Sequence, residues 1–133
     1  MITSKKIMRI TAIILMLIMG IGALAAGYSF MVDPSGQGIG ITTAYLQYSP
    51  FKDFLIPGIV LFTFNGVFNI ASAIATFFKA IYHPYFILFQ GCILTGWIAV
   101  QVIMVHDFNL LHLICLVTGI TLMIIGWKLR LQN

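Results

Sequence analysis

The sequence predicts an all-α membrane protein, an antiparallel four-helix transmembrane bundle with the N and C termini in the cytoplasm. The chain has 133 residues, of which 61% are hydrophobic and only 8% are charged. Four apolar runs each approach or exceed the ~20 residues that a helix needs to cross a hydrocarbon layer about 30 Å thick. These runs are 10–27, 54–78, 84–105 and 108–127. They occupy most of the chain, so we expect one transmembrane domain over 1–133.

The charged residues are sorted between the segments that connect these runs. Segments that would share one membrane face carry Lys5, Lys6, Arg9, Lys79, Lys128 and Arg130. Segments that would share the other face carry Asp33, Asp53 and Asp107, with Lys52 as the only cation. Cationic loops are retained in the cytoplasm, so this sorting predicts that both termini lie inside. The formal charge of +4 then reflects contact with anionic lipid headgroups, and no nucleic-acid partner is expected.

The first run, 10–27, has two interpretations. Lys5, Lys6 and Arg9 followed by apolar residues that end in Ala23-Leu24-Ala25 imitate a cleavable signal peptide. The apolar run is longer than the usual core of such a peptide. We therefore expect a retained first transmembrane helix.

The only long connection, 28–53, is predicted to lie outside the cell. Asp33-Pro34-Ser35-Gly36 has the composition of a β-turn. Aromatic rings prefer the membrane interface to water, so the loop is expected to fold over the mouth of the bundle. The rings concerned are Tyr28, Phe30, Tyr45, Tyr48 and Phe51.

The second run, 54–78, is expected to begin early and to bend. Ser49 is a suitable N-cap and Pro50 a suitable first helical residue, so this helix is predicted to start before the membrane does. Pro57 lacks a backbone donor and should kink it.

The remaining two runs, 84–105 and 108–127, follow short connections at 79–83 and 106–107. Short connections force neighbouring helices to run antiparallel, which favours an up-down bundle. Cys92 and Cys115 differ in depth by about 9 Å on parallel axes. This is too far for a disulfide, whose Cα atoms lie within about 7 Å, so both are expected as buried thiols.

Small and polar residues recur at spacings of three and four on each run, and they predict the faces that meet in the bundle. Asn69 and Gln90 lie the same number of residues from the outer ends of their runs. The same holds for Gln101 and His112. An unpaired amide in hydrocarbon costs several kcal/mol. Hydrogen bonds are therefore expected between Asn69 and Gln90 and between Gln101 and His112.

These polar residues support two interpretations. They are either hydrogen-bonding contacts that hold the helices together or the lining of a pocket for a small ligand. The candidate ligand-binding residues are Asn65, Asn69, Gln90, Trp97, Gln101 and His112. No Asp, Glu, Lys or Arg lies within any run, which argues against an ion-driven or proton-driven pump. A neutral or lipid-like ligand remains open.

No group of residues indicates catalysis, a metal site or a cofactor. His106, Asp107 and His112 include metal-ligating types, but the spacing of the two histidines does not place them on one helical face. His83 and His112 would lie near opposite membrane faces, which disfavours haem. No nucleophile, base and orienting acid occur together at one depth.

Two blocks of the sequence resemble a known group of proteins. They are Asp33-Pro34-Ser35-Gly36 and the stretch from Ser49-Pro50-Phe51 through Asp53-Phe54-Leu55-Ile56-Pro57-Gly58. These blocks, with Gly96-Trp97 and Gln101 in the third run, resemble small four-span bacterial membrane proteins. The resemblance covers most of the chain. It implies the same topology and a bacterial inner membrane, and it implies no activity.

The lack of catalytic groups and the abundance of small-residue faces favour a non-enzymatic accessory or interaction subunit. Its partner would be a larger membrane protein or further copies of the chain. A second hypothesis is a binding protein or carrier for a small neutral or lipid-like molecule in an intrabundle polar pocket. A third is a membrane immunity or protection protein that occludes a toxin.

Overall fold

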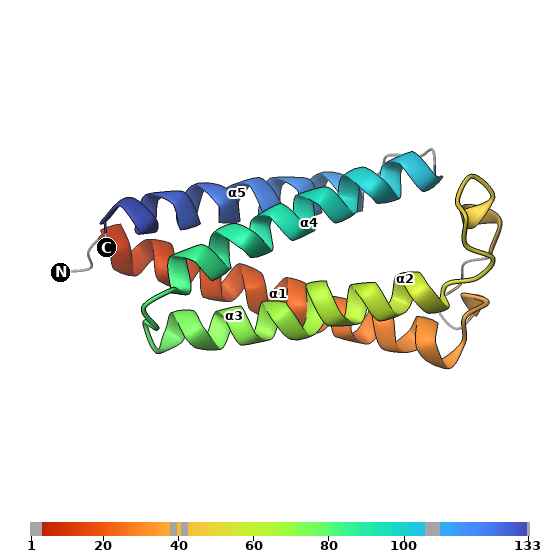
Figure 1. Ribbon diagram of the computed structural model, residues 1–133, viewed down its shortest axis with the longest axis horizontal. Coiled ribbons are helices and arrows are strands. Elements are labelled where there is room, and N and C mark those ends of the chain that lie inside the picture. The colour runs from red at the N-terminus through yellow and green to blue at the C-terminus, as the bar shows by residue number, and fades with distance from the viewer. Residues whose placement is uncertain (1–3, 38–39, 41–42, 106–109, 133) are drawn as a thin grey trace.

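The computed structural model describes residues 4–37, 40, 43–105 and 110–132. This part of the chain is helical and contains no strand. Four helical segments are long and apolar enough to cross a membrane: Ser4–Val32, Leu55–Phe77, His83–Ile103 and Leu110–Leu131. The apolar runs of the sequence therefore correspond to helices of membrane-spanning length (Figure 1).

The first and last spans are longer than the sequence predicts. Helix α1 covers Ser4–Val32 rather than 10–27, and helix α5 covers Leu110–Gln132 rather than 108–127. Helix α4 covers His83–Val105, within one residue of its prediction. Because α1 continues to Val32, Tyr28 and Phe30 belong to a helix and not to the connecting loop.

The second span begins later than the sequence predicts and is built from three pieces. Helix α2 covers Leu55–Val60, a π-helix, η3, covers Leu61–Val67, and helix α3 covers Phe68–Phe77. Ser49 does not cap a helix. Its hydroxyl donates to the Leu46 carbonyl at 2.9 Å and accepts from the Phe51 N–H at 3.2 Å, which forms a turn.

Pro57 does not interrupt the helix as the sequence predicts. Pro57 is the third residue of α2, so its missing N–H falls among donors that have no intrahelical partner in any case. The departure from α-helical geometry lies one turn later, in η3. At its end the Phe68 N–H donates to the Thr63 carbonyl, five residues back. Such π segments occur frequently at functional sites.

The connection after α1 is held at both ends. The Phe54 N–H donates to the Pro34 carbonyl at 2.9 Å, and the Phe30 and Phe54 rings stack with centroids 4.7 Å apart. The predicted turn is present, with the Gly36 N–H donating to the Asp33 carbonyl at 3.1 Å. A short 3₁₀ helix, η2 (Thr43–Leu46), packs against α4. The loop thus covers part of the bundle, although Tyr48 is exposed and the Tyr45 side chain lies outside the description.

The helices pack as two tight pairs. Helix α1 packs along α2, η3 and α3 (the first pair), and α4 packs along α5 (the second pair). Contacts between the pairs are much sparser. Within the pairs, glycines allow the backbones to approach. A Cβ on Gly27 would lie 2.8 Å from the Gly58 carbonyl oxygen, and one on Gly126 would lie 2.6 Å from the Leu88 nitrogen. Backbone approach at glycine is the usual means of close packing in membranes.

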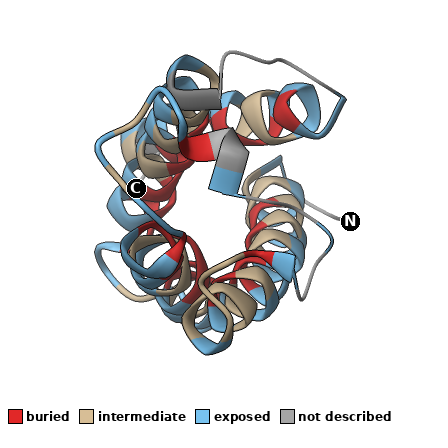
Figure 2. Ribbon diagram, turned by 90° about the vertical axis from the view of Figure 1, so that its right-hand side faces the viewer, coloured by how far each residue is buried: buried red, intermediate tan, exposed pale blue. Residues whose placement is uncertain are grey.

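The apolar core shared by the two pairs lies in one half of the bundle. It consists of Ala12, Met16, Ala73, Ile87, Leu122, Ile125 and Leu129. These residues come from the beginning of α1, the end of α3, the beginning of α4 and the end of α5. Seen end-on, buried residues line the inner faces of the helices (Figure 2). Toward the end that carries η2, α4 diverges from α2 (Figure 1).

The N and C termini lie at the same end of the molecule (Figure 1). The link between α3 and α4, which contains Lys79, lies at that end too, and η2 lies at the other. Most of the cations among the described residues therefore lie at the end of the molecule that holds both termini. Asp107, which the charge argument also uses, lies outside the described residues.

Candidate functional site

A groove of about 440 Å³ opens between the first pair and α4, on the half of the bundle where the pairs diverge. We name it the Asn65 groove. It is lined by Phe51, Pro57, Val60, Phe64, Asn65, Ile93, Gly96, Trp97 and Val100. Its volume falls within the range of small-molecule sites, about 300–1,000 Å³. Two residues of the sequence-predicted site, Asn65 and Trp97, meet here across two helical segments.

Asn65 contributes to the wall of this groove. It lies within the π-helix η3, and its side chain is only 2% exposed. Neither Nδ2 nor Oδ1 has a hydrogen-bond partner in the described structure. Buried amides in native proteins are almost always hydrogen-bonded. Both atoms are closed off from the groove, whose exposed surface is almost wholly apolar, so the unpaired amide lies behind the groove wall.

Further buried polar atoms lie inside the bundle near this level. Both polar atoms of Gln90 on α4, the Ser72 hydroxyl on α3 and the Thr95 hydroxyl on α4 lack partners among the described residues. The predicted hydrogen bond between Asn69 and Gln90 is absent. Asn69 Nδ2 instead donates to the Asn65 backbone carbonyl at 2.7 Å, within its own segment. The two amides are both fully buried, but they do not satisfy one another.

Gln101 and His112 do not line the Asn65 groove. Gln101 lies on α4 and is partly buried, and His112 lies near the beginning of α5 and is buried. Residues 106–109, which include the metal-ligating types His106 and Asp107, are not described. In the remainder of the chain, no three His, Cys, Asp or Glu side chains gather as a metal site would require.

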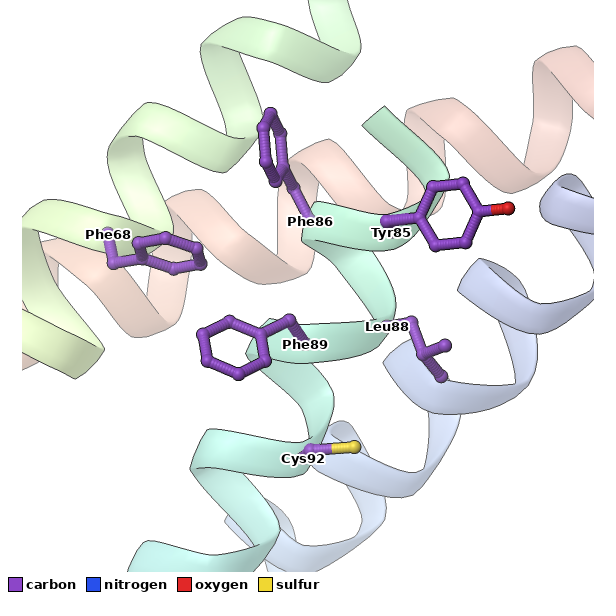
Figure 3. A pocket seen from close by; sticks show the side chains of 6 residues that line it. All are labelled: Phe68, Tyr85, Phe86, Leu88, Phe89 and Cys92. Carbon is purple, nitrogen blue, oxygen red and sulfur yellow. The ribbon is translucent and has the colours of Figure 1, made fainter. Parts of the chain in front are cut away.

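A second groove, of about 560 Å³, lies on α4 nearer the termini. We name it the Phe68 groove, and it is lined by Phe68, Tyr85, Phe86, Leu88, Phe89 and Cys92 (Figure 3). The Phe68 ring approaches Phe89 from the neighbouring helix, with centroids 5.5 Å apart and planes at 74°. Cys92 is exposed here and carries a free thiol, so the expectation of a buried thiol is wrong for this residue.

Most residues that line the two grooves are apolar, so the polar pattern that singles out candidate site residues in the sequence does not include them. Gly96 is the exception, because a glycine beside Trp97 in an apolar helix indicates either close packing or open space. The structure shows open space: a Cβ on Gly96 would meet no atom within 4 Å. Gly22 in α1 is similarly open, whereas Gly91 and Gly119 sit against neighbouring helices.

Comparisons with protein-family models, with curated proteins and with solved structures found no match.

Proposed function

We propose that this chain is an integral membrane protein that binds or carries a small, uncharged, amphipathic molecule in the Asn65 groove. The observation that supports this function best is the apolar groove itself, together with the unpaired Asn65 amide that lies behind its wall. A ligand with an apolar body would fill the groove, and a hydrogen-bonding group on it would satisfy the amide once the Asn65 side chain turned outward. Leaving the amide unsatisfied costs about 1–3 kcal/mol.

The chemistry of the lining favours an uncharged ligand. No Asp, Glu, Lys or Arg lies within the four apolar runs, so a buried ion would find no countercharge there. Burial of an unpaired charge is far more costly than burial of a neutral polar group. Asn65 offers both a donor and an acceptor. A hydroxyl or an amide complements such a pair, whereas a carboxylate or an ammonium uses only half of it.

The accessory-subunit hypothesis rests mainly on the small-residue faces, and the structure accounts for most of these internally. Gly20, Gly27, Gly58, Gly66, Gly91, Gly119 and Gly126 each face a neighbouring helix so closely that a Cβ would clash. These faces hold the helices of each pair together and are not presented to a partner. No comparable observation favours the toxin-occluding hypothesis.

We further propose an antiparallel arrangement with both termini in the cytoplasm of a bacterial inner membrane. The charge sorting of the sequence supports this orientation. The position of both termini at one end supports it too. At that end the Arg130 guanidinium lies 4.0 Å from the centroid of the Trp127 ring, a pairing suited to a membrane interface. The bacterial inner membrane follows from the resemblance of the Asp33 and Ser49 blocks.

Cysteine labelling tests the orientation. In a background with Cys92 and Cys115 replaced by serine, Ser35→Cys is expected to react with an impermeant maleimide added to intact cells. Ile81→Cys should react only after the membrane is opened, because position 81 would face the cytoplasm. The reverse pattern would overturn the proposed orientation.

Filling the Asn65 groove tests the binding function. Gly96→Leu places a side chain in the open part of the groove without a backbone clash. It is expected to weaken binding of 1-monooctanoylglycerol by at least about tenfold, equivalent to about 1.4 kcal/mol. Binding is measured by native mass spectrometry of the purified protein in detergent.

Gly22→Leu is the matched control, since Gly22 has equally open surroundings on α1 and does not line the groove. This variant should bind 1-monooctanoylglycerol like the unmodified protein. If Gly96→Leu also binds normally, the Asn65 groove is not the site.

A further inference from the structure

The end of the molecule that holds both termini is rich in cations, and none of its described residues is acidic. The acidic side chains of the sequence are Asp33, Asp53 and Asp107. Asp33 and Asp53 adjoin the ends of α1 and α2 at the opposite end of the molecule, with η2 between them in the chain. Asp107 lies outside the described residues. A cation at the end with the termini therefore finds no carboxylate side chain among the described residues there.

Arg130, in the last turn of α5, is held on one side and open on the other. Its guanidinium carbon lies 4.0 Å from the centroid of the Trp127 ring. Nε is buried and has no hydrogen-bond partner in the described structure, whereas the two terminal nitrogens are not among the buried atoms. The planar group therefore has a fixed direction and leaves its two terminal nitrogens accessible. Such a pair of donors matches the oxygens of a phosphate.

The packing of α5 fixes where this guanidinium lies. A Cβ on Gly126 would lie 2.8 Å from the Pro84 carbonyl oxygen, so α5 touches the start of α4 at this point. Arg130 follows Gly126 by four residues and lies one turn further toward the end of the molecule. The residue before it, Leu129, is fully buried in the apolar core with Ala12 of α1. The last turn of α5 is thus anchored, and Arg130 is carried on a rigid part of the bundle.

Exposed aromatic rings mark the same end of α4 and α5. Trp127, Tyr82 and Tyr85 are each about half exposed, and the two tyrosine rings have centroids 6.3 Å apart. Tryptophan and tyrosine collect where the headgroups of a membrane meet its hydrocarbon. Arg130 therefore lies at the level of lipid phosphates. A molecule bound there would meet a cation and an exposed apolar ring side by side, which suits a phosphate that is attached to an apolar body.

We propose that Arg130 and Trp127 form a binding site for an anionic phospholipid at the end of α5. The terminal nitrogens of Arg130 donate two parallel hydrogen bonds to the phosphate oxygens, and the lipid body lies against the exposed part of the Trp127 ring. A headgroup with net negative charge is favoured, because a zwitterionic lipid carries its own cation close to the phosphate. Basic sites at helix ends recognise lipid headgroups in this way. This site is separate from the Asn65 groove and does not depend on the function proposed for it.

Lipid titration of the protein in a nonionic detergent, read by native mass spectrometry, tests the site. The probes are dioleoylphosphatidylglycerol and dioleoylphosphatidylcholine, which share their acyl chains and differ in the headgroup. The unmodified protein is expected to bind the phosphatidylglycerol about tenfold more tightly, and Arg130→Gln is expected to remove about this factor, the size of one charge-assisted hydrogen-bonding contact. Equal binding of the two lipids by the unmodified protein would overturn the proposal.

Lys128→Gln is the matched control, because it removes one charge from the same turn of α5. Lys128 is exposed, and a single exposed charge contributes little, so this variant should weaken the binding of phosphatidylglycerol by no more than about twofold. Equal losses in Arg130→Gln and Lys128→Gln would show that the lipid responds only to the overall charge of this end, and the site would be rejected.

Two further measurements complete the test. Arg130→Lys keeps the charge and lacks the planar pair of donors, so it should bind phosphatidylglycerol several-fold less tightly than the unmodified protein. This conservative variant tests the site even if Arg130→Gln does not fold, and full affinity in Arg130→Lys would contradict the two parallel hydrogen bonds. A large excess of inorganic phosphate should leave lipid binding unchanged. Displacement of the lipid would identify a free phosphate as the ligand and overturn the assignment to a phospholipid.

Discussion

Replacing Gly126 by alanine is expected to destabilise the protein by about 2–3 kcal/mol, the upper part of the range for overpacking a tight contact. The new Cβ would lie 2.6 Å from the nitrogen of Leu88, 2.8 Å from its Cα and 2.8 Å from the Pro84 carbonyl oxygen. These are backbone atoms of α4, which cannot move aside as a flexible side chain can. Helices α4 and α5 would have to move apart at this contact. Unfolding by sodium dodecyl sulfate in mixed micelles measures the loss.

Gly22→Ala is the control for this experiment. No atom lies within 4 Å of a Cβ at this position. Alanine favours a helix over glycine by up to about 1 kcal/mol, so this variant should match or exceed the stability of the unmodified protein. If Gly126→Ala is as stable as Gly22→Ala, α4 and α5 do not pack as closely as described.

Replacing Gln90 by leucine is expected to raise the stability of the ligand-free protein by about 1–3 kcal/mol. Gln90 is fully buried, and both of its amide atoms lack partners in the described structure. Leucine has a similar volume and carries no polar atoms, so it removes the desolvation cost without leaving a large cavity. The same unfolding assay gives the measurement, and a marked loss of stability would show that Gln90 has an important partner.

Asn69→Leu provides the comparison for Gln90→Leu. Asn69 Nδ2 donates to the Asn65 carbonyl at 2.7 Å, so its replacement sacrifices a buried hydrogen bond and should gain less stability or lose some. No hydrogen bond joins Asn69 to Gln90. The double replacement is therefore expected to equal the sum of the single changes, and strong coupling would indicate a direct bond between the two amides.

The four spans could be predicted from the sequence because length and apolar composition decide whether a helix crosses a membrane. The ends of the helices could not. Ser49 and Pro50 have the composition of a helix start, yet the Ser49 hydroxyl is used in a turn and the helix begins at Leu55. The same residues are suited both to a helix start and to a turn. In the folded chain the contacts of the loop with α1 favour the turn.

The pairing of Asn69 with Gln90 failed for a reason that the sequence does not show. Equal depth places Asn69 opposite Gln90 only if the second span turns by the same angle at each residue. The π-helix over Leu61–Val67 adds a residue to its turns and so changes which side chains share a face. Asn65 lies inside this segment, while Asn69 follows it and bonds back to the Asn65 carbonyl. Sequence periodicity alone gives no indication of this shift.

The division into two tight pairs also bears on how the chain assembles during synthesis. Each pair is formed by segments that are neighbours in the sequence, and the contacts between the pairs are sparse. Contacts between sequence neighbours form early, and chains generally fold from the N-terminal part as they emerge from the ribosome. Helix α1 can close onto α2, η3 and α3 before α4 and α5 are translated. The contact between the two pairs, where the Asn65 groove opens, is then the last part of the bundle to form, at a stage when surrounding lipid can still enter it.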